Sequence, residues 1–590
     1  MVAVCAPAAR AVAVAVLALA AWAAPAGAVT VDATALLSRS VNGGMPNGPS
    51  RNPAFSQDRQ IGSVVAFESD ASDLVAGDGN SNVTDIFAVR RANAGSDGLR
   101  GLPWATSAPQ LVTHALGGGP ANGPSSLPSV DGDQDHDGLG GLPRPHCVAY
   151  ISAASNLVSG DTNNQPDAFV TDLSSGATTR VSVDTSGRQA NGATYDVQVD
   201  GGCKRVAFTS DAPNLALTQR TWQRAGAPPE WKPVVTTASD PRVKQVYVRV
   251  LRAAKNGAPS TKDEALAGAT FLASANDRHV AGNGPSYDVS LTRSDGCPVE
   301  CKGPHGAAIA SGVGVAFTSE AANLSAADTN GTADVYRRLF VSGRAKAGTK
   351  RPKKAPPTPW GPPSITGNLV SATPGGGPGD APSGQPSIDA RGRYVAFTTA
   401  ADDILPCQSL PAGQVCDTNG TSDVVWRDFG GRKPRTMWAS ASGAIGQPGN
   451  GASSNPSITR YGSVFLQSDA TNLQPRPISD RLLEDRNGTG DVFYWSEQFK
   501  NVTLYSQDSD NDVHGNPASR TAAQPGVATA PALNPATSAY NNYVAFESGD
   551  PLLDLSVGAP MFGSDRDGAA RAAVSNPALH QVYLRYVGPR

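Results

Sequence analysis

The feature that most constrains the fold is a short apolar run of the form Val-Ala-Phe that returns seven times along the chain. Each copy is rich in β-branched and aromatic residues and is bounded by Gly, Asn and Asp, which is typical of a β-strand between turns. The copies are Val65-Ala66-Phe67, Val148-Ala149-Tyr150, Val206-Ala207-Phe208, Val315-Ala316-Phe317, Val395-Ala396-Phe397, Val464-Phe465-Leu466 and Val544-Ala545-Phe546. One unit cannot bury its apolar face alone, so the pattern predicts a repeat architecture in which neighbouring units pack on each other.

Other strands accompany this run in every unit. The clearest unit is Gln385 to Asp428, and it opens with a short run that precedes its Val-Ala-Phe strand. An Asp-rich loop follows that strand and leads to a further strand at Asp423-Val424-Val425. A fourth strand follows in most copies, for example Thr179-Arg180-Val181-Ser182, and leads to an Asn-Gly turn. These turns are Asn122-Gly123, Asn191-Gly192, Asn283-Gly284 and Asn450-Gly451. We expect them to use the positive φ that Asn-Gly provides in tight reversals.

Four strands repeated seven times predict an all-β fold, a seven-bladed β-propeller of four-stranded blades. The seventh copy stops just after its third strand, at Tyr586, while an unassigned strand, Ala35 to Arg39, lies near the N-terminus. If this strand completes the last blade, the ring closes and no sheet edge stays exposed. An open solenoid would gain nothing from the arrangement, so we predict a closed ring.

The predicted organisation is a leader at residues 1–28 and a single propeller domain at 29–590. The approximate blades are 50–116, 124–184, 192–276, 284–373, 384–441, 452–507, and 528–590 with 33–40. Long Gly/Pro-rich or charged insertions fall near 251–265 and 344–363. The second insertion is strongly basic. It reads either as a solvated loop or as a contact site for an anionic polymer.

The first 28 residues have the pattern of a secretory signal peptide. Arg10 precedes an apolar run, Ala11 to Ala24, which is followed by small residues up to Ala28. The run is short for a membrane span, although an uncleaved anchor is the alternative. We therefore predict a secreted, periplasmic or cell-envelope protein whose mature chain starts near Val29.

Six cysteines remain after the leader, an even number that suits an oxidising compartment. Cys297 and Cys301 could close a small loop, as could Cys407 and Cys416. Cys147 and Cys203 would then form a pair. Zinc is the alternative for Cys297 and Cys301, but the chain offers no second ligand pair at a suitable spacing.

The charge balance argues against nucleic-acid binding. The formal net charge is −3, with 48 Lys and Arg against 51 Asp and Glu. A chain this balanced has no basic footprint for a polyanion over its whole surface.

An Asp-rich turn of the form D-x-N-x-x-x-D recurs before the third strand of the blades. Alternating oxygen ligands around a sharp turn suit Ca²⁺, although no copy has the distal Glu of an EF-hand. The alternative is that Asp and Asn only cap the turn. The candidate metal ligands are Asp161, Asn163, Asp167, Asp328, Asn330, Asp334, Asp417, Asn419, Asp423, Asp485, Asn487 and Asp491.

A second candidate Ca²⁺ loop lies in the insertion DGDQDHDGLGG. Asp133, Asp135 and Asp137 match the first half of an EF-hand loop, but Arg144 stands where that loop has its Glu. So many carboxylates repel one another unless they are solvated or bind a cation. Ca²⁺ is therefore the one cofactor that the sequence suggests.

Evidence for catalysis is weak. The chain has no G-x-S-x-G elbow, no H-E-x-x-H and no P-loop motif, and its seven His show no ligand spacing. A carboxylate pair in the central funnel could still serve a glycoside hydrolase or a polysaccharide lyase. That alternative predicts converging carboxylates, at least one of them with a raised pKa.

The run Ile388 to Phe397, followed by Asp423 to Asp428, resembles the WD-like repeat of TolB-type propellers. In that family the repeat is roughly S-P-D-G-R-x-(I/V)-A-F followed by D-I-(Y/F)-V-x-D. The likeness implies a periplasmic propeller that binds a protein partner through its mouth. The sequence departs from that family in three ways: we expect no N-terminal α/β domain, it has seven rather than six units, and it carries D-T-N-G loops.

Taken together, the residues and the resemblance predict an exported, non-enzymatic, TolB-like propeller that binds a protein or an envelope glycan across its mouth. Propellers carry variable loops on a rigid ring, and recognition usually lies there. We expect a monomer that binds no nucleic acid and has no membrane span after signal cleavage.

Overall fold

A computed structural model describes the parts of the chain that build the ring. These are residues 34–58, 62–80, 83–91, 104, 107–132, 147–215, 218–221, 230–233, 243–251, 268, 270–276, 280–293, 311–342, 368–405, 417, 419–431, 433–442, 447–473, 489–498, 501–506, 532–538, 543–549 and 580–586. The predicted leader, residues 252–265 and 344–363 of the two long insertions, and Cys297, Cys301, Cys407 and Cys416 lie outside the described residues.

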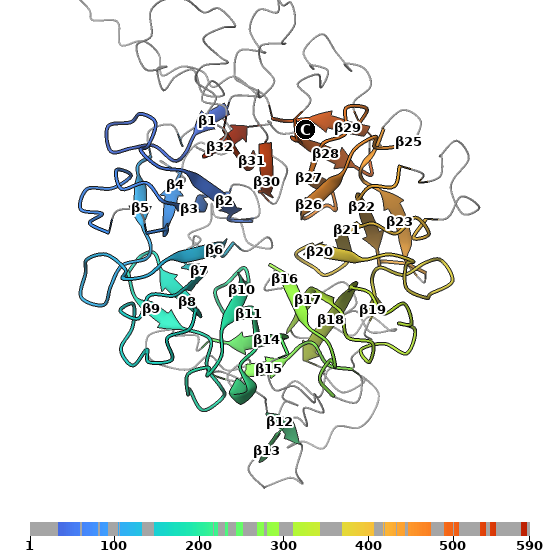
Figure 1. The fold of residues 1–590 in the computed structure, drawn as a ribbon, viewed down its shortest axis with the longest axis horizontal. Helices are drawn as coiled ribbons and strands as arrows, with labels where there is room; N and C mark the ends of the chain where they lie inside the picture. Colours follow the sequence, from blue (N-terminus) through green and yellow to red (C-terminus); the bar gives the residue numbers. More distant parts are fainter. Residues whose placement is uncertain are drawn as a thin grey trace, which may run out of the picture.

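Seven four-stranded antiparallel sheets stand around a common centre (Figure 1). Blade 1 is β2 (Ser50–Phe55), β3 (Val64–Ser69), β4 (Asp85–Arg90) and β5 (Pro109–Leu111). Blade 2 is β6 (Ser125–Val130), β7 (Cys147–Ser152), β8 (Asp167–Asp172) and β9 (Thr178–Arg180). Blade 3 is β10 (Thr194–Val199), β11 (Arg205–Ser210), β14 (Gln245–Val250) and β15 (Thr270–Leu272). Blade 4 is β16 (Ser286–Leu291), β17 (Ser311–Ser319), β18 (Asp334–Ser342) and β19 (Asn368–Leu369).

The remaining blades follow the same order from the centre outwards. Blade 5 is β20 (Ser383–Ile388), β21 (Tyr394–Thr399), β22 (Asp423–Asp428) and β23 (Arg435–Trp438). Blade 6 is β26 (Ser453–Ile458), β27 (Val464–Ser468), β28 (Asp491–Ser496) and β29 (Asn501–Leu504). Blade 7 is β30 (Ala532–Thr537), β31 (Tyr543–Ser548), β32 (Gln581–Tyr586) and β1 (Thr34–Leu36). The predicted seven-bladed, all-β fold is confirmed.

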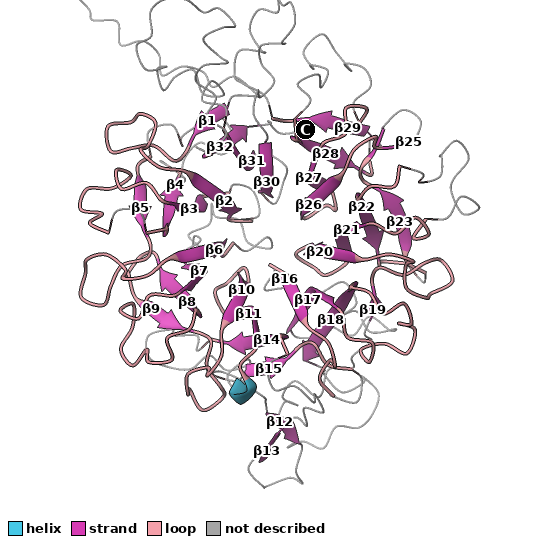
Figure 2. Cartoon of the chain, viewed as in Figure 1, coloured by secondary structure: helices cyan, strands magenta, loops and turns pink. Residues whose placement is uncertain are grey.

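Small elements outside the blades complete the described structure. They are the hairpins β12 (Thr218–Thr221) with β13 (Glu230–Pro233) and β24 (Ala441–Ser442) with β25 (Gln447–Pro448), and a 3₁₀ turn at Pro213–Leu215. Figure 2 shows that strands and loops make up nearly all of the ring. Among the described residues, no helix has the length and apolarity needed to cross a membrane.

The N-terminal strand closes the ring, as the sequence predicted. β1 pairs antiparallel with β32, with Ala35 opposite Leu584. Leu36 is fully buried and packs with Tyr583 in the cluster between blades 6 and 7. The strand therefore supplies both the last hydrogen-bonded ladder and part of an interblade core.

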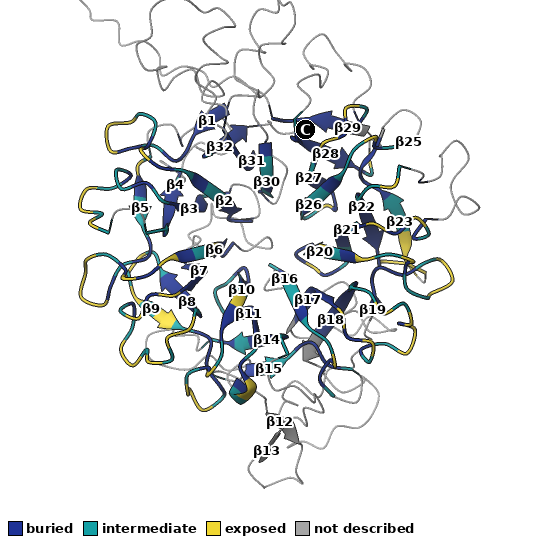
Figure 3. Cartoon of the chain, viewed as in Figure 1, coloured by how far each residue is buried: buried dark blue, intermediate teal, exposed yellow. Residues whose placement is uncertain are grey.

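The core lies between blades rather than within one of them. Each of the seven apolar clusters among the described residues combines side chains of two neighbouring blades. The second strands are buried on both faces, which explains why they read as continuous apolar runs (Figure 3). In blade 1, for example, Phe67 stacks on Phe87, while Ala66 packs against blade 2.

In every blade, a buried pair of an Asp or Gln side chain and a hydroxyl joins the start of the third strand to the end of the fourth. The first residue of each third strand is Asp or Gln, and it accepts a hydrogen bond from a Ser or Thr just beyond the fourth strand. The same hydroxyl accepts the next backbone N–H of the third strand. The pairs are Asp85 with Thr113, Asp167 with Ser182, Gln245 with Ser274, Asp334 with Ser371, Asp423 with Ser440, Asp491 with Ser506 and Gln581 with Ser38.

The Asn-Gly turns require glycine for a different reason from the one expected. Neither Asn122 nor Gly123 has a positive φ, so the predicted backbone conformation is wrong. A Cβ on Gly123 would lie 2.9 Å from the carbonyl carbon of Ala153, so glycine is needed for close approach of two backbones. Asn122 donates its backbone N–H to Asn156 Oδ1 at 3.1 Å, so the turn is also bonded to the loop after β7.

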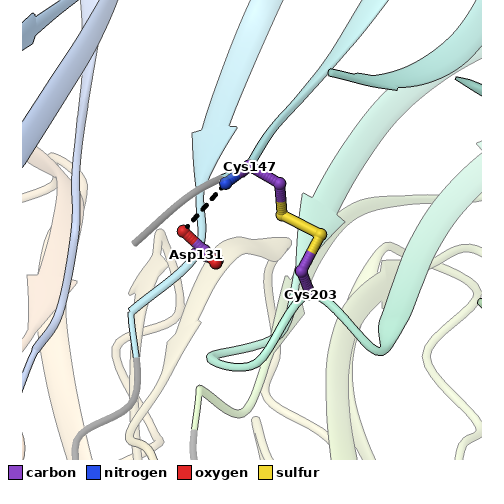
Figure 4. A group of neighbouring side chains, drawn as sticks. All are labelled: Asp131, Cys147 and Cys203. Carbon is purple, nitrogen blue, oxygen red and sulfur yellow. Dashed lines mark hydrogen bonds between the residues drawn. A yellow bond between two sulfur atoms is a disulfide. The ribbon is translucent and has the colours of Figure 1, made fainter. Parts of the chain in front are cut away.

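The predicted pair of Cys147 and Cys203 forms a disulfide between blades 2 and 3 (Figure 4). Beside it, the backbone N–H of Cys147 donates to Asp131 Oδ1 at 3.3 Å. The sulfur atoms and Asp131 lie within 4.8 Å of one another, but the disulfide leaves no thiolate to bind a metal.

Candidate functional site: the central funnel

A central funnel of about 320 Å³ is lined by the first strands of all seven blades. Its main lining is the third residue of each first strand, which we call the inner ring. The inner ring consists of Asn52, Leu127, Asp196, Asp288, Gln385, Asn455 and Asn534. In Figure 1 these strands, β2, β6, β10, β16, β20, β26 and β30, surround the centre of the molecule.

A bulge at each ring position directs these residues to the funnel. The register between the first and second strands shifts at this point in every blade. Six ring residues have a φ between 49° and 54°, and Asp196 is the exception. A positive φ is costly for a residue other than glycine, so the six bulges are held by surrounding contacts.

Hydrogen bonds between blades hold the bulges. Glu547 on β31 accepts the backbone N–H of Asn52 at 3.0 Å, and Glu68 on β3 accepts that of Leu127 at 2.7 Å. Gln467 on β27 accepts the backbone N–H of Asn534 at 3.1 Å. In each case a long acceptor on a second strand reaches the ring residue of the next blade.

In blades 4 and 5, the second strand has a short threonine at this position. There, the ring residue of the same blade accepts the backbone N–H of the ring residue in the next blade. Asp288, supported by Thr318, accepts the backbone N–H of Gln385 at 3.3 Å. Gln385, supported by Thr398, accepts that of Asn455 at 3.2 Å. Short and long side chains thus compensate for each other around the ring.

The hydrogen bonds of Asp196 differ from those of the other ring residues, because the residues that follow Asp196 and Asp288 are not proline. Five ring residues precede Pro, but Asp196 and Asp288 precede Val197 and Val289, which carry backbone N–H donors. Asp196 accepts both of these N–H groups, at 2.7 Å from Val197 and 2.5 Å from Val289. Its carboxylate therefore satisfies the two donors that proline removes in the other blades.

Two carboxylates of the funnel come from adjacent blades. Burial, with a smaller contribution from the charge of Asp288, raises the pKa of Asp196 to about 7 against the opposing effect of the Val289 and Val197 N–H groups. Burial also raises the pKa of Glu68 behind the ring. The carboxylates with a raised pKa that the enzyme alternative requires are thus present in or beside the funnel.

Two tyrosines stand beside these carboxylates. Tyr195 and Tyr287 hold equivalent positions, one residue before Asp196 and Asp288. Tyr195 donates its hydroxyl to Asp211 at 2.9 Å, and Tyr287 donates to Glu320 at 3.0 Å. These hydrogen bonds fix the orientation of both rings, and Lys244 Nζ lies 3.9 Å from the centre of the Tyr195 ring.

At the other ends of the first strands, one arginine spans three blades. Arg293, just after β16, donates to Val130 O at 2.5 Å and to Gln198 Oε1 at 3.1 Å. Burial lowers its pKa to about 10. A Cβ on Gly201 would lie 1.9 Å from Arg293 O, so the strand ends of blades 2, 3 and 4 meet closely here.

The described Asp-rich turns lie where predicted, before the third strands, away from the inner ring. Asn163 Nδ2 donates to Asp167 Oδ2 at 3.0 Å and to Ala190 O at 2.9 Å. Asn419 Nδ2 makes the matching pair of bonds in blade 5, to Asp423 and to Gly449 O. Asn330 in blade 4 donates to Gly379 O. These Asn residues cap the turn and link it to the chain that enters the next blade.

Several predicted ligands cannot be placed. Asp133, Asp135, Asp137, Asp485 and Asn487 lie outside the described residues, whereas Asp491 is the buried partner of Ser506. Calcium binding at these positions stays a prediction.

The sequence does carry a signal for the inner ring that the strand markers do not reveal. The spacing Ser-x-x-Pro returns at Ser50, Ser125, Ser383 and Ser453, and the ring residue is the one before Pro. Only the three-dimensional arrangement shows that these separate dipeptides line one funnel.

No protein-family model and no curated protein sequence matches this chain. Solved structures similar to it include TolB from Acinetobacter baumannii, with 12% identity, 77% of this chain and 63% of that chain covered, and a TM-score of 0.28. A prolyl endopeptidase has 10% identity, 85% and 45% coverage and a TM-score of 0.33. Oligogalacturonate lyase from Vibrio parahaemolyticus has 9% identity, 95% and 97% coverage and a TM-score of 0.38.

A second TolB, from Agrobacterium tumefaciens, is also among the similar structures. The resemblance to TolB-like propellers that the repeat indicated thus recurs among the solved structures. The chain spans less than two thirds of the length of the first TolB and of the endopeptidase. Identities and TM-scores this low carry no conclusion about what this chain does.

Proposed function

We propose that the protein is an exported binding scaffold that receives part of a protein or of an envelope glycan in its central funnel. The observation that carries this proposal is the inner ring. Seven side chains from seven blades line one funnel, and bonds between blades fix their backbones in place. A preorganised concave site of this kind favours binding because little conformational freedom is lost on association.

The side chains favour a ligand that offers hydrogen-bond donors or a positive charge. Asp288 uses Oδ2 for Thr318 and Gln385, and Oδ1 has no hydrogen-bond partner among the described residues. Gln385 next to it is exposed.

The test is retention of a ligand by the immobilised mature chain from an envelope extract. Asp288→Asn keeps an oxygen acceptor for the Gln385 N–H but removes the charge. We expect it to reduce retention by about tenfold, the effect of roughly 1.4 kcal/mol. Glu497→Gln, at the exposed Arg435 ion pair on the outer part of blade 6, is the matched control and should retain the ligand like the wild type. Equal retention by Asp288→Asn, or none by the wild type, contradicts the proposal.

The second candidate function is a propeller enzyme acting on a polysaccharide, a glycoside hydrolase or a lyase. The carboxylates Asp196 and Asp288, with the raised pKa of Asp196, favour it. Against it, both oxygens of Asp196 already accept backbone N–H groups. Release of reducing ends or unsaturated products from polysaccharides, lost in Asp288→Asn, would support this activity; no release by the wild type would exclude it for the substrates tried.

A further inference from the structure

The Asp-rich turn of blade 4 contains three buried oxygens without a hydrogen-bond donor among the described residues. They are Asp328 Oδ1, Thr332 Oγ1 and Asp334 Oδ2, all within seven residues of sequence. Asp328 is 6% exposed and Asp334 is fully buried. Their other carboxylate oxygens are satisfied by Tyr336 Oη at 2.6 Å and by Ser371 Oγ. The buried Arg338 guanidinium lies 5.9 Å from the centre of the Tyr336 ring, but none of the three oxygens has it as a hydrogen-bond partner. Burying a charged oxygen without a partner is costly, so these groups favour a bound cation or protons.

The two carboxyls are close enough to interact. Burial, with a smaller contribution from the charge of Asp328, raises the pKa of Asp334 to about 6 against the opposing effects of the Ser371 hydroxyl and the Asn330 amide. Two facing carboxylates repel each other unless a positive charge lies between them.

Blade 2 has the same turn and supplies its own positive charge. Arg180 Nη1 lies 3.3 Å from Asp161 Oδ1 and 3.8 Å from Asp167 Oδ2. Gln189 Nε2 donates to the same two oxygens, at 2.8 and 3.0 Å. A guanidinium and an amide thus occupy the space between the two carboxylates.

Blade 4 has lost both groups. Arg180 pairs with Phe169 in blade 2, and the equivalent partner of Tyr336 in blade 4 is Leu369. The Asn of the turn bonds to Ala190 O in blade 2 and to Gly379 O in blade 4, so Gln189 is replaced by Pro378. Leu369 and Pro378 have no side-chain donor.

We propose that the blade 4 turn binds one Ca²⁺, held by Asp328 and Asp334, where blade 2 has the Arg180 guanidinium. Thr332 Oγ1 is a further oxygen in the same turn. Oxygen ligands select a hard cation, and Ca²⁺ accepts an irregular set completed by water more readily than Mg²⁺ does. With two carboxylates, we expect a dissociation constant on the order of 10⁻⁴ to 10⁻³ M, the range of extracellular sites.

The experiment is equilibrium dialysis of the full mature chain against Ca²⁺, with the number of bound ions as the readout. Asp328→Asn removes one carboxylate but keeps an acceptor for the Tyr336 hydroxyl, and we expect it to bind one ion fewer than the wild type. Asp161→Asn in blade 2 is the matched control, and it should bind as many ions as the wild type. The difference is independent of Ca²⁺ bound elsewhere in the chain.

A second variant keeps both carboxylates. Leu369→Arg introduces into blade 4 the cation that blade 2 has, and it should also bind one ion fewer. Circular dichroism verifies the β-structure of each variant. If Asp328→Asn does not fold, the number of ions bound by Leu369→Arg is the deciding measurement. The proposal is overturned if the wild type binds no Ca²⁺, or if a folded Asp328→Asn or Leu369→Arg variant binds as many ions as the wild type.

Discussion

At the scale of single residues, the buried Asp and hydroxyl pairs explain why the same polar residue opens the third strand in blade after blade. The carboxyl or amide oxygen, the hydroxyl and the backbone N–H form a closed group that joins the last two strands. Apolar packing alone would not require Asp there. The recurrence of Asp at this position therefore reflects hydrogen bonding between the third and fourth strands.

Ser182→Ala tests this group in blade 2. The change leaves Asp167 Oδ1 and the Ala168 N–H without their buried partner, and we expect the free energy of unfolding to fall by about 1–3 kcal/mol. Urea unfolding measures it. Ser159→Ala, at an exposed position, should change the stability by less than about 0.5 kcal/mol. Equal effects of the two changes would contradict the structural role of the pair.

Buried carboxyls also predict how stability depends on pH. Burial raises the pKa of Asp423 to about 7, with the neighbouring Asp417 contributing, and raises the pKa of Asp85 to about 6. These folded-state values lie above the ordinary value of 3.8, so the native state binds more protons than the unfolded state between pH 4 and 7. Stability is therefore expected to rise as the pH falls from 8 to 5.

Thermal melts in EDTA between pH 8 and 5 measure this dependence. The Tm should increase on acidification, and Asp423→Asn, which cannot titrate, should show a smaller increase than the wild type. A Tm that falls steadily over this range would show that other groups dominate.

At the scale of elements, neighbouring blades depend on one another. Each apolar cluster spans two blades, and the inner ring is held by acceptors from adjacent blades. The disulfide adds a covalent link between β7 and the turn before β11. No blade is a separate stable unit in such an arrangement.

Replacing Cys147 and Cys203 together by Ser tests the covalent link. The bridge closes a segment with a sequence separation of 56. The chain-entropy account then gives a loss of about 4 kcal/mol, an upper value because the unfolded chain retains structure. Urea unfolding of the double variant measures the loss. Wild-type protein with dithiothreitol should behave like the variant, whereas an unchanged midpoint in both would show that the link adds nothing.

At the scale of the whole molecule, closure of the ring by β1 joins residues at opposite ends of the chain. Ser38 Oγ donates to Gln581 Oε1 at 2.8 Å, and Leu37 packs with Leu584 in the cluster between blades 7 and 1. Closure leaves neither end of the ring as an open sheet edge.

Leu36→Ala tests closure. The side chain is fully buried, and we expect its truncation to cost about 2–5 kcal/mol. Leu116→Ala, at a position 68% exposed, is the control and should be nearly neutral. Differential scanning fluorimetry and size-exclusion chromatography are the measurements, since a loosened β1 should lower the Tm and expose β32 to self-association. A Tm equal to that of the control variant would mean that β1 is not essential to the ring.

Much of the fold could be predicted because its cause is local and repeated. The Val-Ala-Phe runs are buried on both faces in every blade, so their seven copies predicted seven blades. The unassigned N-terminal strand predicted how the ring closes. The Asn-Gly turns show the limit of local reasoning. Their glycines are needed because Gly123 approaches the backbone at Ala153, a contact that spans two strands.

What the sequence by itself determined is the number of blades, their strand order and the way the ring closes, since hydrophobic periodicity and turn residues act over short distances. What only the tertiary structure decided is which polar residues meet. Asp196 and Asp288 are 92 residues apart and become neighbours because two blades bring equivalent positions together. The turns at Asp161 and Asp328 look alike in sequence. Arg180 lies beside the carboxylate of Asp161, whereas Asp328 Oδ1 has no hydrogen-bond partner among the described residues. The chemistry of a site depends on the contacts across strands and blades, which no single repeat encodes.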